Sequence, residues 1–120
     1  MRATALVRVT GAEWAEEPLA GLAGRDVVAV AGVARPERFV ATLERAGMTV
    51  RRLLRFPDHH RYTSSDVAAI GAAAAGDPLV TTEKDLVKLA GFTALDTLRA
   101  LRVALEVEET ETLLDLLTQP

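Results

Sequence analysis

The segment that most constrains the fold of this chain is the run Asp-Val-Val-Ala-Val-Ala-Gly at residues 26–32. After the aspartate the run is uninterruptedly apolar and rich in β-branched valine, and it ends at a glycine. Such a run is typical of a strand that lies inside a parallel sheet with both faces covered. A strand of this kind requires further strands beside it and helices on both faces, which the rest of the sequence must supply.

Strand-like and helix-like patterns alternate along the rest of the chain. Further strands are predicted near residues 5–9, 49–54, 79–81 and 101–107. Helices are predicted over residues 36–46, between residues 63 and 75, from residue 82 to 91, and after Thr110. Residues 13–24 are expected to form a connector with one short helical turn. This alternation predicts an α/β fold, a three-layer α/β/α sandwich around a mainly parallel, Rossmann-like sheet of about four to five strands.

Composition argues against several classes of function. The net charge of −3 and the isoelectric point near 5.4 disfavour nucleic acid as a partner, because phosphate binding needs a basic surface. The absence of cysteine removes disulfides and thiolate zinc sites. No apolar run approaches the roughly 20 residues of a membrane span. The first residues lack the apolar core of a signal peptide, so a cytoplasmic protein is expected.

Both histidines of the chain lie beside a carboxylate in residues 56–62, Phe-Pro-Asp-His-His-Arg-Tyr, between a predicted strand and a predicted helix. Strand ends in α/β folds are where ligands bind, and imidazole titrates near neutral pH. Adjacent residues of an extended loop point to opposite sides, so one imidazole can face a cleft while the other packs or meets solvent. Asp58 is therefore not an automatic partner of His59. The loop fits a general base, but it equally fits a polar loop without chemistry, and a metal site would need more ligands.

Two further segments follow predicted strands. Residues 81–85, Thr-Thr-Glu-Lys-Asp, stand at a strand–helix junction, where free N–H groups favour phosphate. The same pattern also fits ordinary helix capping followed by a solvated charge triplet. Gly32 after the buried strand would let a ligand approach the backbone. Neither G-x-G-x-x-G nor G-x-x-x-x-G-K-[ST] occurs, so any phosphate loop must lie elsewhere.

Residues 30–39, 56–62 and 80–89 together resemble, in order and spacing, the C-terminal part of the tetraacyldisaccharide 4'-kinases. The resemblance covers residues 24–107, and the end of the chain is similar to the closing helix of that family. It implies that residues 24–120 form the C-terminal α/β lobe and that residues 1–23 form a linker strand and connector. The N-terminal P-loop lobe of the family is expected to be absent from these 120 residues.

The resemblance implies a function in lipopolysaccharide biosynthesis. These kinases use ATP to phosphorylate the 4' position of the tetraacyldisaccharide 1-phosphate precursor of lipid A, at the cytoplasmic face of the bacterial inner membrane. ATP would lie between the two lobes, and the missing lobe would supply the phosphate loop, the Mg²⁺ ligands, an acidic catalytic residue and any membrane contact. This fragment alone is therefore expected to be inactive.

The resemblance also assigns roles to residues of this chain. His59 would complete a catalytic dyad with the acid of the missing lobe, Asp58 would orient the loop, and His60 is the alternative catalytic histidine. No metal ligand is expected in this chain. The expected ATP-binding residues follow the first buried strand and the strand at 79–81: Ala31, Gly32, Val33, Arg35, Thr82, Glu83 and Lys84.

Two other interpretations stay open. One is a non-catalytic α/β module that binds a nucleotide or another protein, because the chain holds no complete active site. The other is a metal-dependent phosphoesterase, because an Asp-His-His motif also occurs in such enzymes. That interpretation is weakened by the absence of an Asp-x-Asp motif before residue 58, where Asp26 is the only earlier aspartate.

Overall fold

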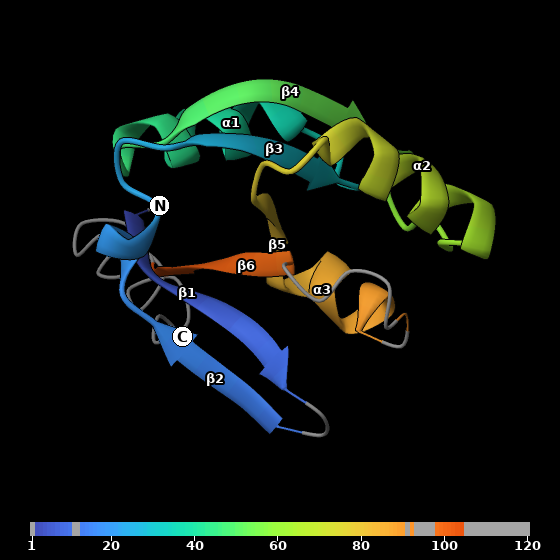
Figure 1. Ribbon diagram of the computed structural model, residues 1–120, viewed down its shortest axis with the longest axis horizontal. Helices are drawn as coiled ribbons and strands as arrows, with labels where there is room; N and C mark the ends of the chain where they lie inside the picture. The colour runs from blue at the N-terminus through green and yellow to red at the C-terminus, as the bar shows by residue number, and fades with distance from the viewer. Residues whose placement is uncertain (1, 11–12, 91, 93–97, 105–120) are drawn as a thin grey trace, which may run out of the picture.

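The computed structural model describes residues 2–10, 13–90, 92 and 98–104. It contains a twisted sheet in the order β2-β1-β6-β5-β3-β4, with β4 at the top and β2 at the bottom of Figure 1. The strands β3 to β6 run parallel, whereas β1 is antiparallel to both β6 and β2. The predicted mainly parallel α/β fold is confirmed, with six strands and an antiparallel edge. The strands are β1 (Arg2–Thr10), β2 (Glu13–Glu17), β3 (Asp26–Ala31), β4 (Thr49–Arg55), β5 (Leu79–Thr82) and β6 (Leu98–Ala104).

Helices cover both faces of the sheet. They are α1 (Pro36–Arg45), α2 (Ser64–Ala74) and α3 (Glu83–Leu89), and a short 3-10 helix, η1 (Leu19–Gly21), precedes β3. Alternate residues of β3 point to opposite sides, so that Val27 belongs to one core cluster and Val28 to the other. Phe39 of α1 packs in the first cluster, and Ile70 of α2 packs in the second. The central strand is thus buried on both faces, as its sequence predicts.

Local signals in the sequence set the helix starts. Pro36 occupies the first turn of α1, where a backbone N–H would have no partner within the helix, so a residue without an N–H is tolerated. At α2 the Thr63 side chain accepts from the backbone N–H of Asp66, whose carboxylate accepts from the backbone N–H of Thr63. Thr82 caps α3 in the same way, by accepting from the backbone N–H of Asp85 at 3.1 Å. Threonine caps are therefore present at α2 and α3, and the cap at α3 is the one that residues 81–85 predict.

The sequence prediction is wrong at two places along the antiparallel edge. Glu13–Glu17, expected within a connector, is the strand β2, which is hydrogen-bonded to β1. Its mostly exposed side chains lack the alternation that marks a half-buried strand. The last described strand begins at Leu98 rather than at residue 101. The helix predicted after Thr110 lies outside the described residues, and the domain boundary near residue 24 stays a prediction.

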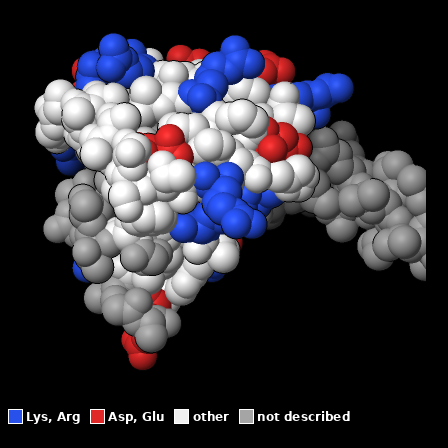
Figure 2. Space-filling view, turned by 90° about the vertical axis from the view of Figure 1, so that its right-hand side faces the viewer, with Lys and Arg blue, Asp and Glu red and all other residues white. Residues whose placement is uncertain are grey.

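The surface carries charges of both signs. Figure 2 turns the side on which α2 and α3 lie in Figure 1 toward the viewer, and lysine and arginine form several separate groups there, with acidic groups between them. None of the described helices is long and apolar enough to cross a membrane. On the face shown in Figure 2, the charged side chains thus form small separate groups and no single large patch of one sign.

The direction in which successive strands are added to the sheet reverses between the parallel neighbours β3 and β5. From β3 the chain passes through α1 to β4, and from β5 it passes through α3 to β6 on the other side. The helices α1 and α3 also pack on opposite faces, because Leu43 and Leu86 belong to different core clusters. In open α/β sheets, the crevice beyond the strand ends at such a reversal is where ligands bind.

Candidate functional site

The three segments singled out in the sequence meet at one edge of the sheet. The backbone N–H of Phe56 donates to the Ala31 carbonyl at 2.9 Å, which ties the β4–α2 loop to the end of β3. The Gly32 N–H donates to Asp85 Oδ2 at 2.9 Å, which ties the β3–α1 loop to α3. Lys84 Nζ donates to Asp58 Oδ1 at 3.0 Å. Loops that are far apart in the sequence are thus fastened to one another at the carboxyl ends of β3, β4 and β5.

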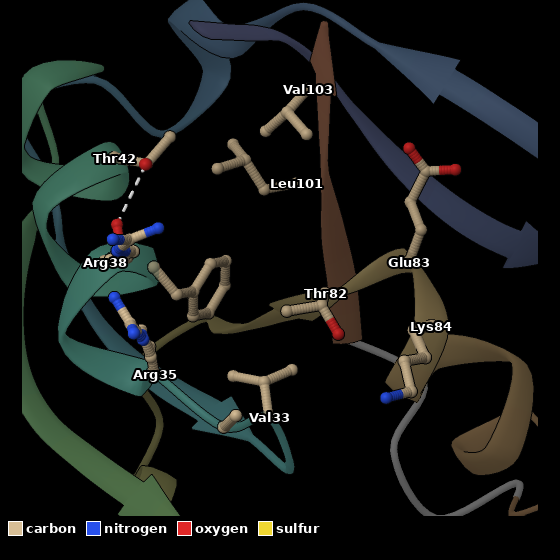
Figure 3. Close-up of a pocket in the computed structure, with 11 residues that line it drawn as sticks. Val33, Arg35, Arg38, Thr42, Thr82, Glu83, Lys84, Leu101 and Val103 are labelled. Atoms are coloured by element: carbon tan, nitrogen blue, oxygen red, sulfur yellow. Dashed lines mark hydrogen bonds between the residues drawn. The ribbon is translucent and has the colours of Figure 1, made fainter. Parts of the chain in front are cut away.

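A pocket of about 570 Å³ opens at this edge, on the side of the sheet covered by α1 (Figure 3). One wall comes from the β3–α1 loop and α1, and the other from the start of α3 and from β6. Five of the predicted ATP-binding residues line it: Val33, Arg35, Thr82, Glu83 and Lys84. The remaining lining residues are Ala34, Arg38, Phe39, Thr42, Leu101 and Val103.

Some charged residues of the pocket form hydrogen bonds with other side chains, and others do not. Arg102 donates to both carboxylate oxygens of Glu83, at 3.2 and 3.3 Å, so this acid is neutralised from the β6 side. Lys84 is held by Asp58 at 3.0 Å. Within the described part of the chain, no group accepts a hydrogen bond from the guanidinium of Arg35 or Arg38, both of which are exposed. Those two side chains, labelled on α1 in Figure 3, are therefore available to an anion.

Three pocket residues of α1 that the sequence interpretation missed follow a simple pattern. Arg38, Phe39 and Thr42 follow Arg35 at spacings of three, four and seven residues, which places all four on one face of a helix. The Thr42 hydroxyl donates to the Arg38 carbonyl at 2.9 Å, drawn as the dashed line in Figure 3. Once Arg35 is taken as a site residue, the rest of its helix face follows from the periodicity.

Gly32 and Ala31 are buried and do not line the pocket. A Cβ at Gly32 would lie 3.0 Å from the Tyr62 hydroxyl, 3.1 Å from Asp85 Oδ1 and 3.2 Å from the Pro57 carbonyl oxygen. The groups that approach this backbone closely are therefore atoms of the protein itself. The glycine is required by the packing of the loops against one another.

Asp85 is fully buried. The interpretation of residues 83–85 as a solvated charge triplet is therefore wrong for this residue. Its Oδ2 accepts from the Gly32 N–H at 2.9 Å and from the Thr82 hydroxyl at 2.8 Å. Its Oδ1 and the buried Tyr62 hydroxyl have no hydrogen-bond partner among the described residues. Burial raises the pKa of Tyr62, and the nearby Asp85 carboxylate adds to this rise, so the hydroxyl keeps its proton.

The two histidines of the 56–62 loop face different surroundings. The His59 side chain is 78% exposed, and its φ of 62° lies in the left-handed region, which is uncommon for a residue with a side chain. Its Nε2 lies 3.7 Å from Asp58 Oδ2. The hydrogen bond from Lys84 is the main cause that holds the pKa of Asp58 below its usual range, and the charge of His59 adds to it. Asp58 is therefore primarily the partner of Lys84.

His60 is half-buried and contacts both its own loop and the start of α2. Its Nε2 lies 2.8 Å from Asp66 Oδ2, and its ring is stacked on Phe56 with ring centroids 4.9 Å apart. Tyr62 meets it edge-on at 5.0 Å. One imidazole thus packs while its neighbour meets solvent, but a turn with left-handed backbone at His59 separates them, and not the alternation of an extended loop.

A metal centre is not evident at this edge. Among the described residues, no three histidine or carboxylate side chains lie together so as to hold a metal ion. The carboxylates nearest the pocket are already engaged, Asp58 by Lys84 and Glu83 by Arg102.

Comparison with known proteins matches this chain to one family. The family model described as tetraacyldisaccharide-1-P 4'-kinase matches residues 2–120. A tetraacyldisaccharide 4'-kinase of Rhodopseudomonas palustris (strain BisA53) is 49% identical over 90 residues, covering 67% of this chain and 26% of the relative. One from Rhodospirillum centenum is 47% identical over 96 residues, covering 78% of this chain and 28% of the relative.

A solved structure is similar as well. It is the "apo" form LpxK from Aquifex aeolicus in complex with ATP, with a TM-score of 0.60 and 29% sequence identity. The match covers 94% of this chain and 33% of that protein. The chain thus spans between about a quarter and a third of the length of these relatives. Because the family model matches nearly every residue, the chain belongs to the tetraacyldisaccharide 4'-kinase family.

Proposed function

We propose that this chain is one lobe of an ATP-dependent kinase that phosphorylates the 4' position of the tetraacyldisaccharide 1-phosphate precursor of lipid A. The observation that carries the proposal is the pocket at the reversal of strand order between β3 and β5, with two arginines that the described residues leave unengaged on one wall and the His59 loop fastened to its rim. Family membership and a relative solved in complex with ATP support it. The reaction of the family would place the complete protein at the cytoplasmic face of the inner membrane.

The pocket has an apolar part and a positively charged part, which suit the base and the phosphates of a nucleotide. Phe39, Leu101 and Val103 give it apolar walls against which a purine base can pack. Arg35 and Arg38 stand where they can meet ribose or phosphate oxygens. We place ATP here, with Val33 and Thr82 beside it and with Lys84 reaching from the rim.

The remaining parts of the reaction are assigned to a second lobe. The 120 residues hold no P-loop motif, so the cradle for the β- and γ-phosphates would come from that lobe. The described residues do not fit a Mg²⁺ site, because their carboxylates at this edge are engaged by Lys84 and Arg102. Phosphoryl transfer depends mainly on positioning and charge stabilisation, which two lobes closing on one nucleotide can provide.

His59 is our candidate for the catalytic histidine. It is exposed, it lies beside Asp58, and its left-handed backbone is the kind of strain that clusters at functional sites. His60 is engaged by Asp66. Paired with a carboxylate of the second lobe, His59 would accept the proton of the 4'-hydroxyl as that oxygen attacks the γ-phosphorus and ADP leaves.

The test joins this chain to a P-loop lobe of the family and measures 4'-phosphorylation of the lipid with labelled ATP. Asparagine tolerates the left-handed backbone, so His59→Asn should keep the fold while lowering kcat by about 10²-fold or more, the usual range for a general base. The matched variant His60→Asn should mainly lower stability, since it weakens the contact with Asp66. Wild-type turnover by His59→Asn would remove this histidine from the mechanism.

The alternatives are separated by binding experiments. A non-catalytic module is favoured if the joined lobes bind ATP without phosphorylating lipid. A phosphoesterase is favoured if calorimetry on the chain alone detects tight binding of Mn²⁺ or Zn²⁺. For the kinase lobe, we expect ATP to shift the amide resonances of Val33, Arg35 and Lys84 at millimolar concentration.

A further inference from the structure

Two buried polar groups lie beside Gly32 at this edge of the sheet, outside the pocket lining. Asp85 Oδ1 and the Tyr62 hydroxyl are buried and close enough for the carboxylate to raise the pKa of the hydroxyl, yet neither atom completes a hydrogen bond among the described residues. Both approach Gly32, since a Cβ built there would lie 3.1 Å from Oδ1 and 3.0 Å from the hydroxyl. Buried polar groups without partners lower stability. A phenylalanine at position 62 would fill nearly the same space without one of these groups, so the hydroxyl calls for an explanation.

Asp85 is also the point where the three loops of the site meet. Its Oδ2 accepts from the Gly32 N–H of the β3–α1 loop and from the Thr82 hydroxyl at the start of α3. Tyr62 belongs to the third loop, three residues after His59. The ring of Tyr62 packs edge-on against the rings of His60 and Phe56, with centroids 5.0 and 5.1 Å apart. A movement of the Tyr62 hydroxyl is therefore coupled to the loop that carries His59.

We propose that Tyr62 and Asp85 are positioning residues: when a nucleotide fills the pocket, the Tyr62 hydroxyl donates a hydrogen bond to Asp85 Oδ1. This bond draws the His59 loop toward the β3–α1 loop. The inference rests on the proposed function, because it concerns the same pocket. The absence of a side chain at Gly32 leaves the two groups facing each other, and the hydroxyl retains the proton that it must donate.

The proposal predicts what happens when the hydroxyl alone is removed. Tyr62→Phe should leave the free energy of unfolding unchanged or higher, because it deletes a buried group without a partner. In the joined kinase, kcat should fall about tenfold with KM for ATP nearly unchanged, since small misplacements of a catalytic group lower the rate steeply. A purely structural role would instead lower stability and leave kcat alone.

A buried hydroxyl elsewhere on the same sheet supplies the control. Thr81 is fully buried and donates to the Val30 carbonyl at 2.7 Å, outside the pocket lining. Thr81→Val should lower stability and leave kcat unchanged. Asp85→Asn should weaken the bond to Gly32, which is seen as an upfield shift and faster exchange of the Gly32 amide proton.

An ATP titration of the chain alone, followed by amide shifts, separates this proposal from the proposed function. In the wild type, the amides of Gly32 and His59 should move together with those lining the pocket. In Tyr62→Phe the pocket amides should still move, while the His59 amide stays near its nucleotide-free position. Identical shifts of His59 in both proteins, or an unchanged kcat in Tyr62→Phe, overturn the positioning role alone. No shift of any pocket amide overturns both proposals.

Discussion

Replacing Gly32 by alanine tests whether the three loops of the site are packed as tightly as their geometry indicates. The new Cβ would lie 3.0, 3.1 and 3.2 Å from three oxygen atoms, those of the Tyr62 hydroxyl, the Asp85 carboxylate and the Pro57 carbonyl. Ordinary contacts of this kind begin at 3.4 Å, so each oxygen must retreat by a few tenths of an ångström. None of the three can simply rotate away, because two belong to buried side chains and one to the backbone.

The expected magnitude follows from two opposing effects. Forcing an extra carbon into a packed interior usually costs about 1–3 kcal/mol. Alanine restricts the unfolded chain more than glycine does, which returns about 0.4–1 kcal/mol. Gly32→Ala should therefore lower the free energy of unfolding by about 1–2 kcal/mol, equivalent to a fall in Tm of roughly 3–10 °C for a domain of this size.

Urea denaturation followed by far-ultraviolet circular dichroism measures this effect, and Gly71→Ala is the matched control. Gly71 lies inside α2, and a Cβ built on it meets no atom within 4 Å. Gly71→Ala should therefore raise the free energy of unfolding by about 0.5–1 kcal/mol, the difference in helix propensity. If Gly32→Ala proves as stable as the wild type while Gly71→Ala gains stability, the close packing inferred at Gly32 is refuted.

Three further predictions concern charge and capping. The hydrogen bond from His60 is the main cause that lowers the pKa of Asp66 below 3.8. The ionised Asp66 carboxylate therefore stabilises the fold fully above pH 3.8, and this stabilisation is lost as the pH falls through the lowered pKa. In Asp66→Asn, the midpoint of urea denaturation should fall less than in the wild type as the pH is lowered from about 5 through the lowered pKa of Asp66. Thr82→Ala should cost about 1 kcal/mol of stability and Thr82→Ser should restore most of it, because the hydroxyl caps α3. Arg35→Gln and Arg38→Gln should each weaken ATP binding severalfold at low salt and less at high salt, measured by calorimetric titration; an effect independent of salt would contradict an electrostatic role.

The parallel part of the fold could be predicted because its signals are local. The valine run of β3 shows burial on both faces, and the hydroxyls of Thr63 and Thr82 mark the starts of their helices. β2 could not be predicted, because its residues are mostly exposed and polar. It is held by pairing with β1 and by contacts such as those from Arg99 and Arg102 to its glutamates, which come from β6 at the other end of the described chain.

The site was predictable to the extent that it lies at strand ends. Placing residues 31–35, 56–62 and 81–85 after strands of one parallel sheet is enough to bring them to one edge. The role of Asp85 was not predictable, because an acid in Glu-Lys-Asp at a helix start looks solvent-exposed by composition alone. Its burial depends on a backbone N–H of Gly32, 53 residues away in the sequence, and no local pattern reveals that contact.

The position of β1 limits the order in which the sheet can assemble. β1 and β2 form a hairpin at the beginning of the chain, but within the described sheet its attachment to the parallel strands is through β6, the last strand. A two-stranded hairpin is at best marginally stable by itself, so β1 and β2 depend on pairing with β6 for their place in the sheet. Arg2 pairs with Ala104, a contact of high sequence separation that slows folding. Within the described sheet, β6 is therefore the strand whose weakening would detach the hairpin first.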